Sequence, residues 1–133
     1  MSDSILNSIK KVLNLSEDDT TFDADVLMHI NSTFSTLKQL GVGPEEGFAI
    51  EDAVPTWDAF FGDNLSFNFI KSYVYLRVRF LFDPPQTSYL IQAMKEERQE
   101  FEHRILTERE RTEWVNPNPA PVDEISVIDG GEP

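Results

Sequence analysis

Apolar side chains recur at helical spacing near the start of the chain. One stripe of an amphipathic helix over residues 4–14 is formed by five of them, Ile5, Leu6, Ile9, Val12 and Leu13. Ser2, Asp3 or Ser4 offers an oxygen to cap this helix. A second helix is predicted from Asp23, as N-cap, to about Leu40, where Gly41 ends it. Its expected buried face is Val26, Leu27, Ile30, Phe34 and Leu37.

The segment FNFIKSYVYLRVRFLFD, residues 67–83, is compatible with two local structures. A strand is favoured by the high aromatic and β-branched content and by an alternation of Tyr73, Tyr75, Arg77 and Arg79 with Val74, Leu76, Val78 and Phe80. A helix also gathers Phe67, Ile70, Val74 and Leu81 on one face. The segment runs for roughly sixteen residues before Pro84, whereas a typical strand has about five or six, and this length favours a helix. Because a residue before proline avoids the helical region, Asp83 is expected to end it.

A last helix is predicted from a Thr87 or Ser88 cap through about Trp114. Its apolar stripe is Leu90, Ile91, Met94, Phe101 and Ile105, and charged residues of both signs cover the rest. Together these patterns predict an all-α fold, a small helical bundle of about four main helices in a domain of residues 1–114.

Two segments cannot be helical. Residues 41–56 hold three glycines and two prolines, which predicts a long loop between the second and third main helices, with Phe48 and Ile50 as a short strand or a hydrophobic flap. Thr56 is expected to cap a short turn after it. Residues 115–133 hold four prolines and two glycines and are predicted to form an extended acidic tail.

The chain has a formal net charge of −13, concentrated at its two ends. Residues 1–63 carry 3 basic and 12 acidic groups and residues 114–133 carry 0 and 4, whereas residues 64–85 carry 3 and 1. Sequence-reading proteins hold DNA by neutralising phosphates, so this balance argues against ordinary DNA binding. A negative wall around a passage does, however, let a duplex slide through without sticking.

Neither a signal peptide nor a membrane span is predicted, so we expect a soluble protein made in the cytoplasm, with no membrane partner. The absence of cysteine excludes thiolate catalysis, disulfides and zinc–thiolate sites.

No catalytic, metal or cofactor site is predicted. Asp25 and His29 stand four residues apart on one helix, but no third ligand accompanies them, so a capping region and a surface histidine explain them better. His103 lies among charged residues of the last helix and is interpreted as solvated. No serine has the glycine pattern of a nucleophile elbow. We therefore expect a protein that is not an enzyme.

The aromatic content is high for one small core, which predicts that part of it is covered by another chain. Arg77 and Arg79 lie in the most apolar segment, where an arginine needs a carboxylate partner, either within the chain or across a subunit interface. The candidate subunit interface is Phe48, Ile50, Trp57, Phe60, Phe61, Arg77 and Arg79.

Several sequence blocks resemble the head-tail connector, or adaptor, proteins of long-tailed bacteriophages and prophages. They are FDAD and HIN in the second helix, QLGVGP with GF and IED in the loop, Trp57 with Phe60, the block YVYLRVRFLFDPP, and AM with EFEHR in the last helix. The resemblance covers about residues 4–106 and implies a small helical bundle with a long loop between its second and third principal helices.

The resemblance also implies a function. Proteins of this kind form a homo-oligomeric ring, expected to be dodecameric, that docks on the portal protein in the neck of the virion and receives the next neck or tail-completion protein. DNA passes through the channel of the ring without sequence-specific binding. On this interpretation, the acidic residues of the loop line the channel, namely Glu45, Glu46, Glu51 and Asp52. Apolar side chains of the C-terminal segment dock on the portal, namely Trp114, Val122, Ile125, Val127 and Ile128.

Three alternatives stay open on the sequence. The tail is also typical of a flexible acidic segment that aids solubility. The whole chain is also compatible with another small neck component, such as a head-completion or tail-terminator protein, or with a monomeric acidic regulator that mimics DNA. The mass of the assembly separates these classes.

Overall fold

The computed structural model describes residues 3–117, which form five α-helices and one 3₁₀ turn without a named strand. The elements are α1 (Ile5–Val12), α2 (Asp23–Gln39), α3 (Trp57–Phe61), η1 (Leu65–Phe67), α4 (Ile70–Phe82) and α5 (Ser88–Arg111). The predicted all-α class is confirmed, and the ambiguous segment before Pro84 is a helix.

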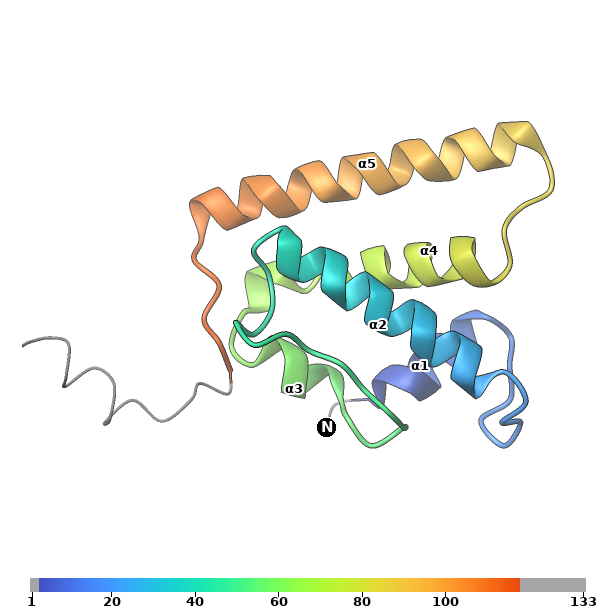
Figure 1. Cartoon of the computed structure of the whole chain (residues 1–133). Helices are drawn as coiled ribbons and strands as arrows, with labels where there is room; N and C mark the ends of the chain where they lie inside the picture. Colours follow the sequence, from blue (N-terminus) through green and yellow to red (C-terminus); the bar gives the residue numbers. More distant parts are fainter. Residues whose placement is uncertain (1–2, 118–133) are drawn as a thin grey trace, which may run out of the picture.

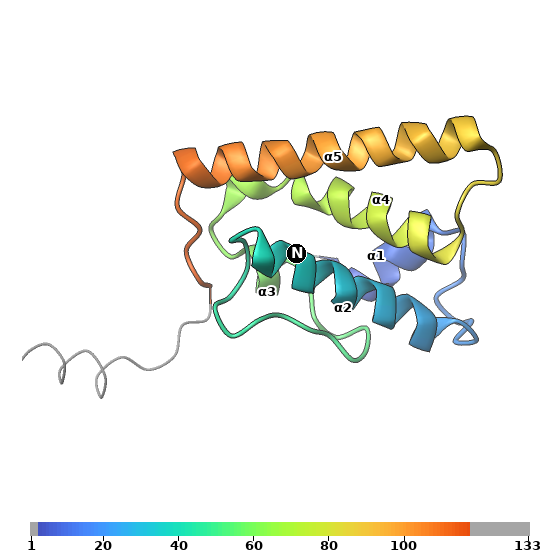
Figure 2. The ribbon, with the colours of Figure 1, turned by 45° about the horizontal axis from the view of Figure 1, so that its top comes forward.

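Helix α4 lies at the centre of the bundle. It packs against α1, α2 and α5, while α5 lies along one side of the molecule above α4 (Figures 1 and 2). Ile70, Tyr73, Val74 and Val78 of α4 are buried. Asp83 follows with φ −141° and ψ 73°, outside the helical region, as expected before Pro84.

The start of α1 and the end of α2 are each explained by local hydrogen bonds. Ser4 caps α1, since its Oγ accepts a hydrogen bond from the backbone N–H of Asn7 at 3.2 Å. At the end of α2, Gly41 has φ +89°, and the N–H groups of Gly41 and Val42 donate to the carbonyls of Lys38 and Leu37. This is a Schellman motif, which requires the left-handed conformation that glycine adopts at least cost.

The prediction that Asp23 caps α2 is wrong. Phe22 occupies the N-cap position, Asp23 is the first helical residue, and its carboxylate is directed to the ammonium group of Lys10 instead. The predicted buried face of α2 is otherwise correct, with one exchange: Leu27 is half-buried and Thr33 is buried. The Thr33 hydroxyl donates to the carbonyl of His29 at 2.9 Å, which satisfies it inside the core.

The loop after α2 is fixed to the bundle rather than free. The side-chain amide of Asn31 pairs with both backbone groups of Ile50, at 2.9 Å to the carbonyl and 2.8 Å from the N–H. The side chain of Ile50 is buried in the hydrophobic core. At the loop's end, Ser4 and Thr56 form an isolated antiparallel bridge that ties residues 3–5 to residues 55–57.

An aromatic cluster fills one end of the core. Phe60 of α3 lies at its centre, with its ring centroid 4.8 Å from that of Phe34, 5.1 Å from that of Phe48 and 5.3 Å from that of Trp114. Phe67 also packs edge-on against Trp114, with ring centroids 5.2 Å apart. Residues from four distant parts of the sequence thus share one apolar cluster.

The last helix is shorter than predicted. Thr87 caps it as expected, but α5 ends at Arg111 instead of about Trp114, because Thr112 is extended and the chain turns back to place Trp114 in the aromatic cluster. Of the predicted stripe, Ile105 is buried, Ile91, Met94 and Phe101 are half-buried, and Leu90 is exposed. Helix α5 therefore buries little of its surface within the chain.

Candidate functional site

Most of the predicted interface aromatics lie in the core of the chain itself. Ile50, Trp57 and Phe60 are each 1% exposed and Phe61 is 4% exposed. Phe48 is half-buried and packs edge-on against Phe34. In this conformation the four buried side chains offer almost no surface to a second subunit, whereas Phe48 is partly accessible. Their burial instead explains why one small core holds so many rings.

The two arginines of α4 have different surroundings. Arg77 is half-buried, its Nη1 lies 3.8 Å from Oε2 of Glu102, and the same nitrogen donates to the hydroxyl of Tyr73 at 3.4 Å. The partner within the chain that the sequence left as one alternative for Arg77 is therefore present. Arg79 is exposed on the surface of α4.

Glu102 of α5 is the polar centre between α4 and α5. It accepts a hydrogen bond from the Tyr73 hydroxyl at 2.8 Å and lies 3.8 Å from Nε of Arg98. Burial of Tyr73, reinforced by its hydrogen bond to Glu102, raises the pKa of Tyr73 to about 12. The neutral phenol is thereby held as a donor across the helix interface.

The acidic residues predicted to line a channel are all exposed on the long loop. Asp52 also shapes the loop, since its carboxylate accepts a hydrogen bond from the backbone N–H of Val54 at 2.9 Å. Glu46 lies 3.5 Å from the amide nitrogen of Asn116. The structure thus gives these carboxylates access to solvent, and their place in an assembly stays a prediction.

The segment after α5, residues 112–117, is held against the bundle. The side-chain amide of Asn64 donates to the carbonyl of Val115 and accepts from its N–H, each at 2.9 Å. Trp114, predicted to dock on the portal, is 9% exposed and belongs to the aromatic cluster. The other predicted docking residues, Val122, Ile125, Val127 and Ile128, lie outside the described residues.

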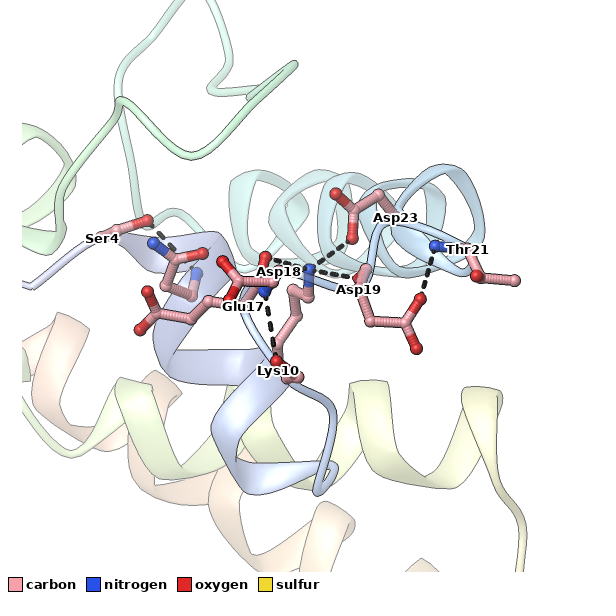
Figure 3. Close-up of polar contacts among 9 residues, drawn as sticks. Ser4, Lys10, Glu17, Asp18, Asp19, Thr21 and Asp23 are labelled. Carbon is pink, nitrogen blue, oxygen red and sulfur yellow. Dashed lines mark hydrogen bonds and ion pairs between the residues drawn. The ribbon is translucent and has the colours of Figure 1, made fainter.

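Sequence reasoning missed the buried Lys10 on α1, which is 1% exposed. Its ammonium group lies 2.8 Å from Oδ1 of Asp23 and donates to the carbonyls of Asp19, at 2.8 Å, and Glu17, at 3.2 Å (Figure 3). The contact with Asp23 is ionic rather than a directed hydrogen bond. The signal was available, because Lys10 follows Ile9 on the apolar side of a short helix that precedes an acidic run.

The two asparagine clamps, Asn31 on Ile50 and Asn64 on Val115, were also missed. Each amide pairs with a backbone N–H and carbonyl of a segment far away in the sequence, which satisfies polar groups that a helical bundle would otherwise bury unpaired. An asparagine in a helix or turn carries no local sign of such a contact.

Within residues 3–117, no group of three or more histidine, cysteine, aspartate or glutamate side chains is placed to hold a metal ion. Over the same described range, no helix is long and apolar enough to cross a membrane. Three surface features are candidates for function: the exposed side of α5, the acidic loop, and a groove between α4 and α5.

The comparison with protein families identifies the class. The family described as phage connector protein matches residues 5–112, and the chain belongs to this family. No curated protein and no solved structure matches the chain significantly. The family match thus supports a phage connector role for this chain, as a structural component of the neck.

Proposed function

We propose that copies of this chain form a closed ring in the neck of the phage particle. The ring, expected to be a dodecamer, docks on the portal protein and presents a surface to the next neck or tail-completion protein. DNA crosses its central channel without being read. Support comes from the family match together with the exposure of α5, a 24-residue helix of which only Ile105 is buried within the chain.

The observation that carries this proposal is the unequal burial of α5. This 24-residue helix packs on α4 and η1 with one side, where Ile105 is buried, and leaves Tyr89, Leu90 and Leu106 exposed on a surface rich in charge. Tyr89 is 81% exposed. Tyr89 and Leu90 are adjacent in the first turn of α5, and neighbouring exposed apolar side chains of this kind are a candidate surface for a second protein to cover.

Charge fits the same proposal. A ring multiplies the net charge of −13 by the number of copies, so like charges must face water or the channel. The loop that carries Glu45, Glu46 and Glu51 is held in place by the Asn31 clamp, and its carboxylates are exposed. A fixed wall of carboxylates repels the phosphates of a passing duplex and so prevents it from sticking.

Phage particles assembled without this chain test the proposal. The expected result is heads that are filled with DNA but carry no tails, seen by electron microscopy, with tails restored when the wild-type chain is supplied. Particles that acquire functioning tails in its absence would exclude a connecting role. A head that fails to fill with DNA would place the chain at an earlier step than the neck.

A further inference from the structure

A shallow groove lies between the C-terminal half of α4 and the N-terminal half of α5. Its lining residues are Leu76, Arg77, Phe80, Leu81, Met94, Lys95 and Arg98. The floor is apolar, and Leu81 at its rim is 40% exposed. All the charged residues of the lining are cations, although the chain as a whole is strongly acidic.

The positive charge of the groove is incompletely neutralised. Glu102 is shared by Arg77 and Arg98, and it lies 3.8 Å from each, whereas a strong charge-assisted hydrogen bond measures about 2.7–2.9 Å. Lys95 is exposed at the edge of the groove. The groove therefore suits a segment that combines apolar side chains with carboxylates.

We propose that the groove binds residues 122–129 of the C-terminal tail of a neighbouring copy. This inference rests on the proposed ring, and it assigns the tail to the next subunit rather than to the portal. The tail reads VDEISVID, an apolar centre with acidic residues on both sides, and residues 114–133 carry four acidic and no basic groups. Its apolar centre matches the floor, and its carboxylates match the cations.

The positions of tail and groove favour a contact between copies. Pro117 packs beside Gly62, just after α3, whereas the groove lies between the C-terminal half of α4 and the N-terminal half of α5. Figure 1 shows α3 near the C-terminal end of α5, away from the connection between α4 and α5. From Arg98 to Arg111 the helix advances about 20 Å, and the chain then turns away from α5 toward α3. Ile125 is eight residues beyond Pro117, so a fully extended tail places it at most about 28 Å from Pro117. A return to the groove of the same chain would use nearly all of this reach.

A tail that leaves one end of the protomer and a groove at the other end make a head-to-tail contact. Contacts of this kind join different surfaces of neighbouring subunits, and they close into a ring when the rotation between subunits permits it. The tail of each copy then occupies the groove of the next, and every groove in the closed ring is filled.

The chain has no cysteine, so every disulfide in a trapping experiment must join cysteines that were introduced on purpose. A double variant with Leu81→Cys in the groove and Val127→Cys in the tail is oxidised and separated on a denaturing gel without reductant. The expected result is a ladder of covalent multimers that collapses on reduction. A monomer with altered mobility and no ladder shows that the tail returns to its own groove, which overturns the proposal.

A matched control pairs Val127→Cys with Met28→Cys, which is 60% exposed on α2 and measures chance collisions. A ladder equal to that of the groove variant also overturns the proposal. Lys95→Glu, added to the groove variant, is expected to lower the ladder yield roughly fivefold, because it places like charges beside the tail carboxylates. Lys11→Glu, an exposed change on α1, should leave the yield unaltered.

Light scattering on the same oxidised and reduced samples separates this inference from the proposed ring. Rings without a ladder contradict the tail contact and leave the ring standing. A ladder that ends in open chains supports the tail contact and contradicts the closed ring. When neither rings nor a ladder form, both proposals fail.

Discussion

The side chain of Asn64 pairs with both backbone groups of Val115, 51 residues later in the chain. Its Nδ2 also donates to the carbonyl of Phe61 at 2.6 Å, so one amide joins the end of α3 to the segment after α5. Trp114, next to the clamped residue, is held in the aromatic cluster by the same contact. The path of the chain toward its C-terminal tail thus depends on Asn64.

Asn64→Ala is expected to release residues 112–117. The change leaves the N–H and carbonyl of Val115 without their partner, and we expect a loss of about 2–3 kcal/mol in the free energy of unfolding. Trp114 becomes hydrated, so its fluorescence shifts to longer wavelength. Asn68→Ala, at an exposed position, is the control.

A Trp114→Phe background assigns the fluorescence signal. The indole N–H of Trp114 is buried without a hydrogen-bond acceptor among the described residues, so its replacement by phenylalanine removes no polar contact. In this background Asn64→Ala should give no red shift, because Trp57 remains buried. A red shift that persists there would show that Asn64 supports the core near Trp57 instead of the C-terminal segment.

Lys10→Met is expected to lower the free energy of unfolding by about 3 kcal/mol, because it leaves the carboxylate of Asp23 without its partner. This value is at the lower end of the range for a buried ion pair, since the side chain of Asp23 is 26% exposed. Lys11→Met on the exposed side of the same helix should change the free energy of unfolding by less than about 0.5 kcal/mol. Urea denaturation measures both values.

The double variant Lys10→Met with Asp23→Asn tests the origin of that loss. Because it removes the unpaired carboxylate as well, it should recover part of the stability, so the two changes are not additive. Strict additivity would mean that Lys10 stabilises the fold through the carbonyls of Glu17 and Asp19 alone.

The raised pKa of Tyr73 predicts that the free energy of unfolding falls at alkaline pH. Its pKa is raised from 10.0 to about 12, so between these values the unfolded chain loses the phenolic proton while the folded chain keeps it. The stabilising contribution is complete below pH 10 and is lost as the pH rises toward 12, by a total of order 2 kcal/mol. Chemical denaturation at several alkaline pH values measures this slope.

Tyr73→Phe should abolish that part of the slope and cost about 1 kcal/mol at neutral pH, because the hydrogen bond to Glu102 is lost. Tyr89→Phe is the matched control, since Tyr89 is 81% exposed. An ultraviolet titration in which all three tyrosines ionise near pH 10 would contradict the assignment.

Tyr89→Glu tests the exposed side of α5. A carboxylate at this position adds like charge to the proposed interface and should weaken subunit association roughly tenfold, while helical content stays unchanged by circular dichroism. Gln99→Glu places the same charge on the same helix at another exposed position. Equal weakening by both variants would point to net charge alone rather than to a contact at Tyr89.

Assembly is also expected to depend on salt. With −13 on each copy, added salt screens the repulsion between subunits and should raise the fraction of assembled protein. Light scattering between low and moderate ionic strength measures this fraction. Assembly that is indifferent to ionic strength would remove the support for an acidic channel.

The helices were predictable because their signals are local. Ser4 and Thr87 cap as expected, Gly41 ends α2 as expected, and the length of the segment before Pro84 distinguished a helix from a strand. The prediction for Asp23 was wrong because aspartate is suited both to capping a helix and to pairing with a buried lysine. The demand of Lys10 for a carboxylate arises only when the core is packed.

The surfaces were not predictable in the same way. An aromatic-rich sequence shows that rings will be buried, but it does not show whether their own chain or a neighbour covers them. Here Phe60 and Trp114 cover one another from positions 54 residues apart. The groove between α4 and α5 likewise combines Arg77 with Arg98, which no spacing rule brings together.

The mass of the protein, alone over a range of concentrations and mixed with the portal of its own phage, tests the central claim most directly. Size-exclusion chromatography with multi-angle light scattering should show a species with a fixed integer multiple of 15.2 kDa, twelvefold for the expected ring, formed by the chain or gained by the portal. A chain that stays at 15.2 kDa under both conditions would contradict the account.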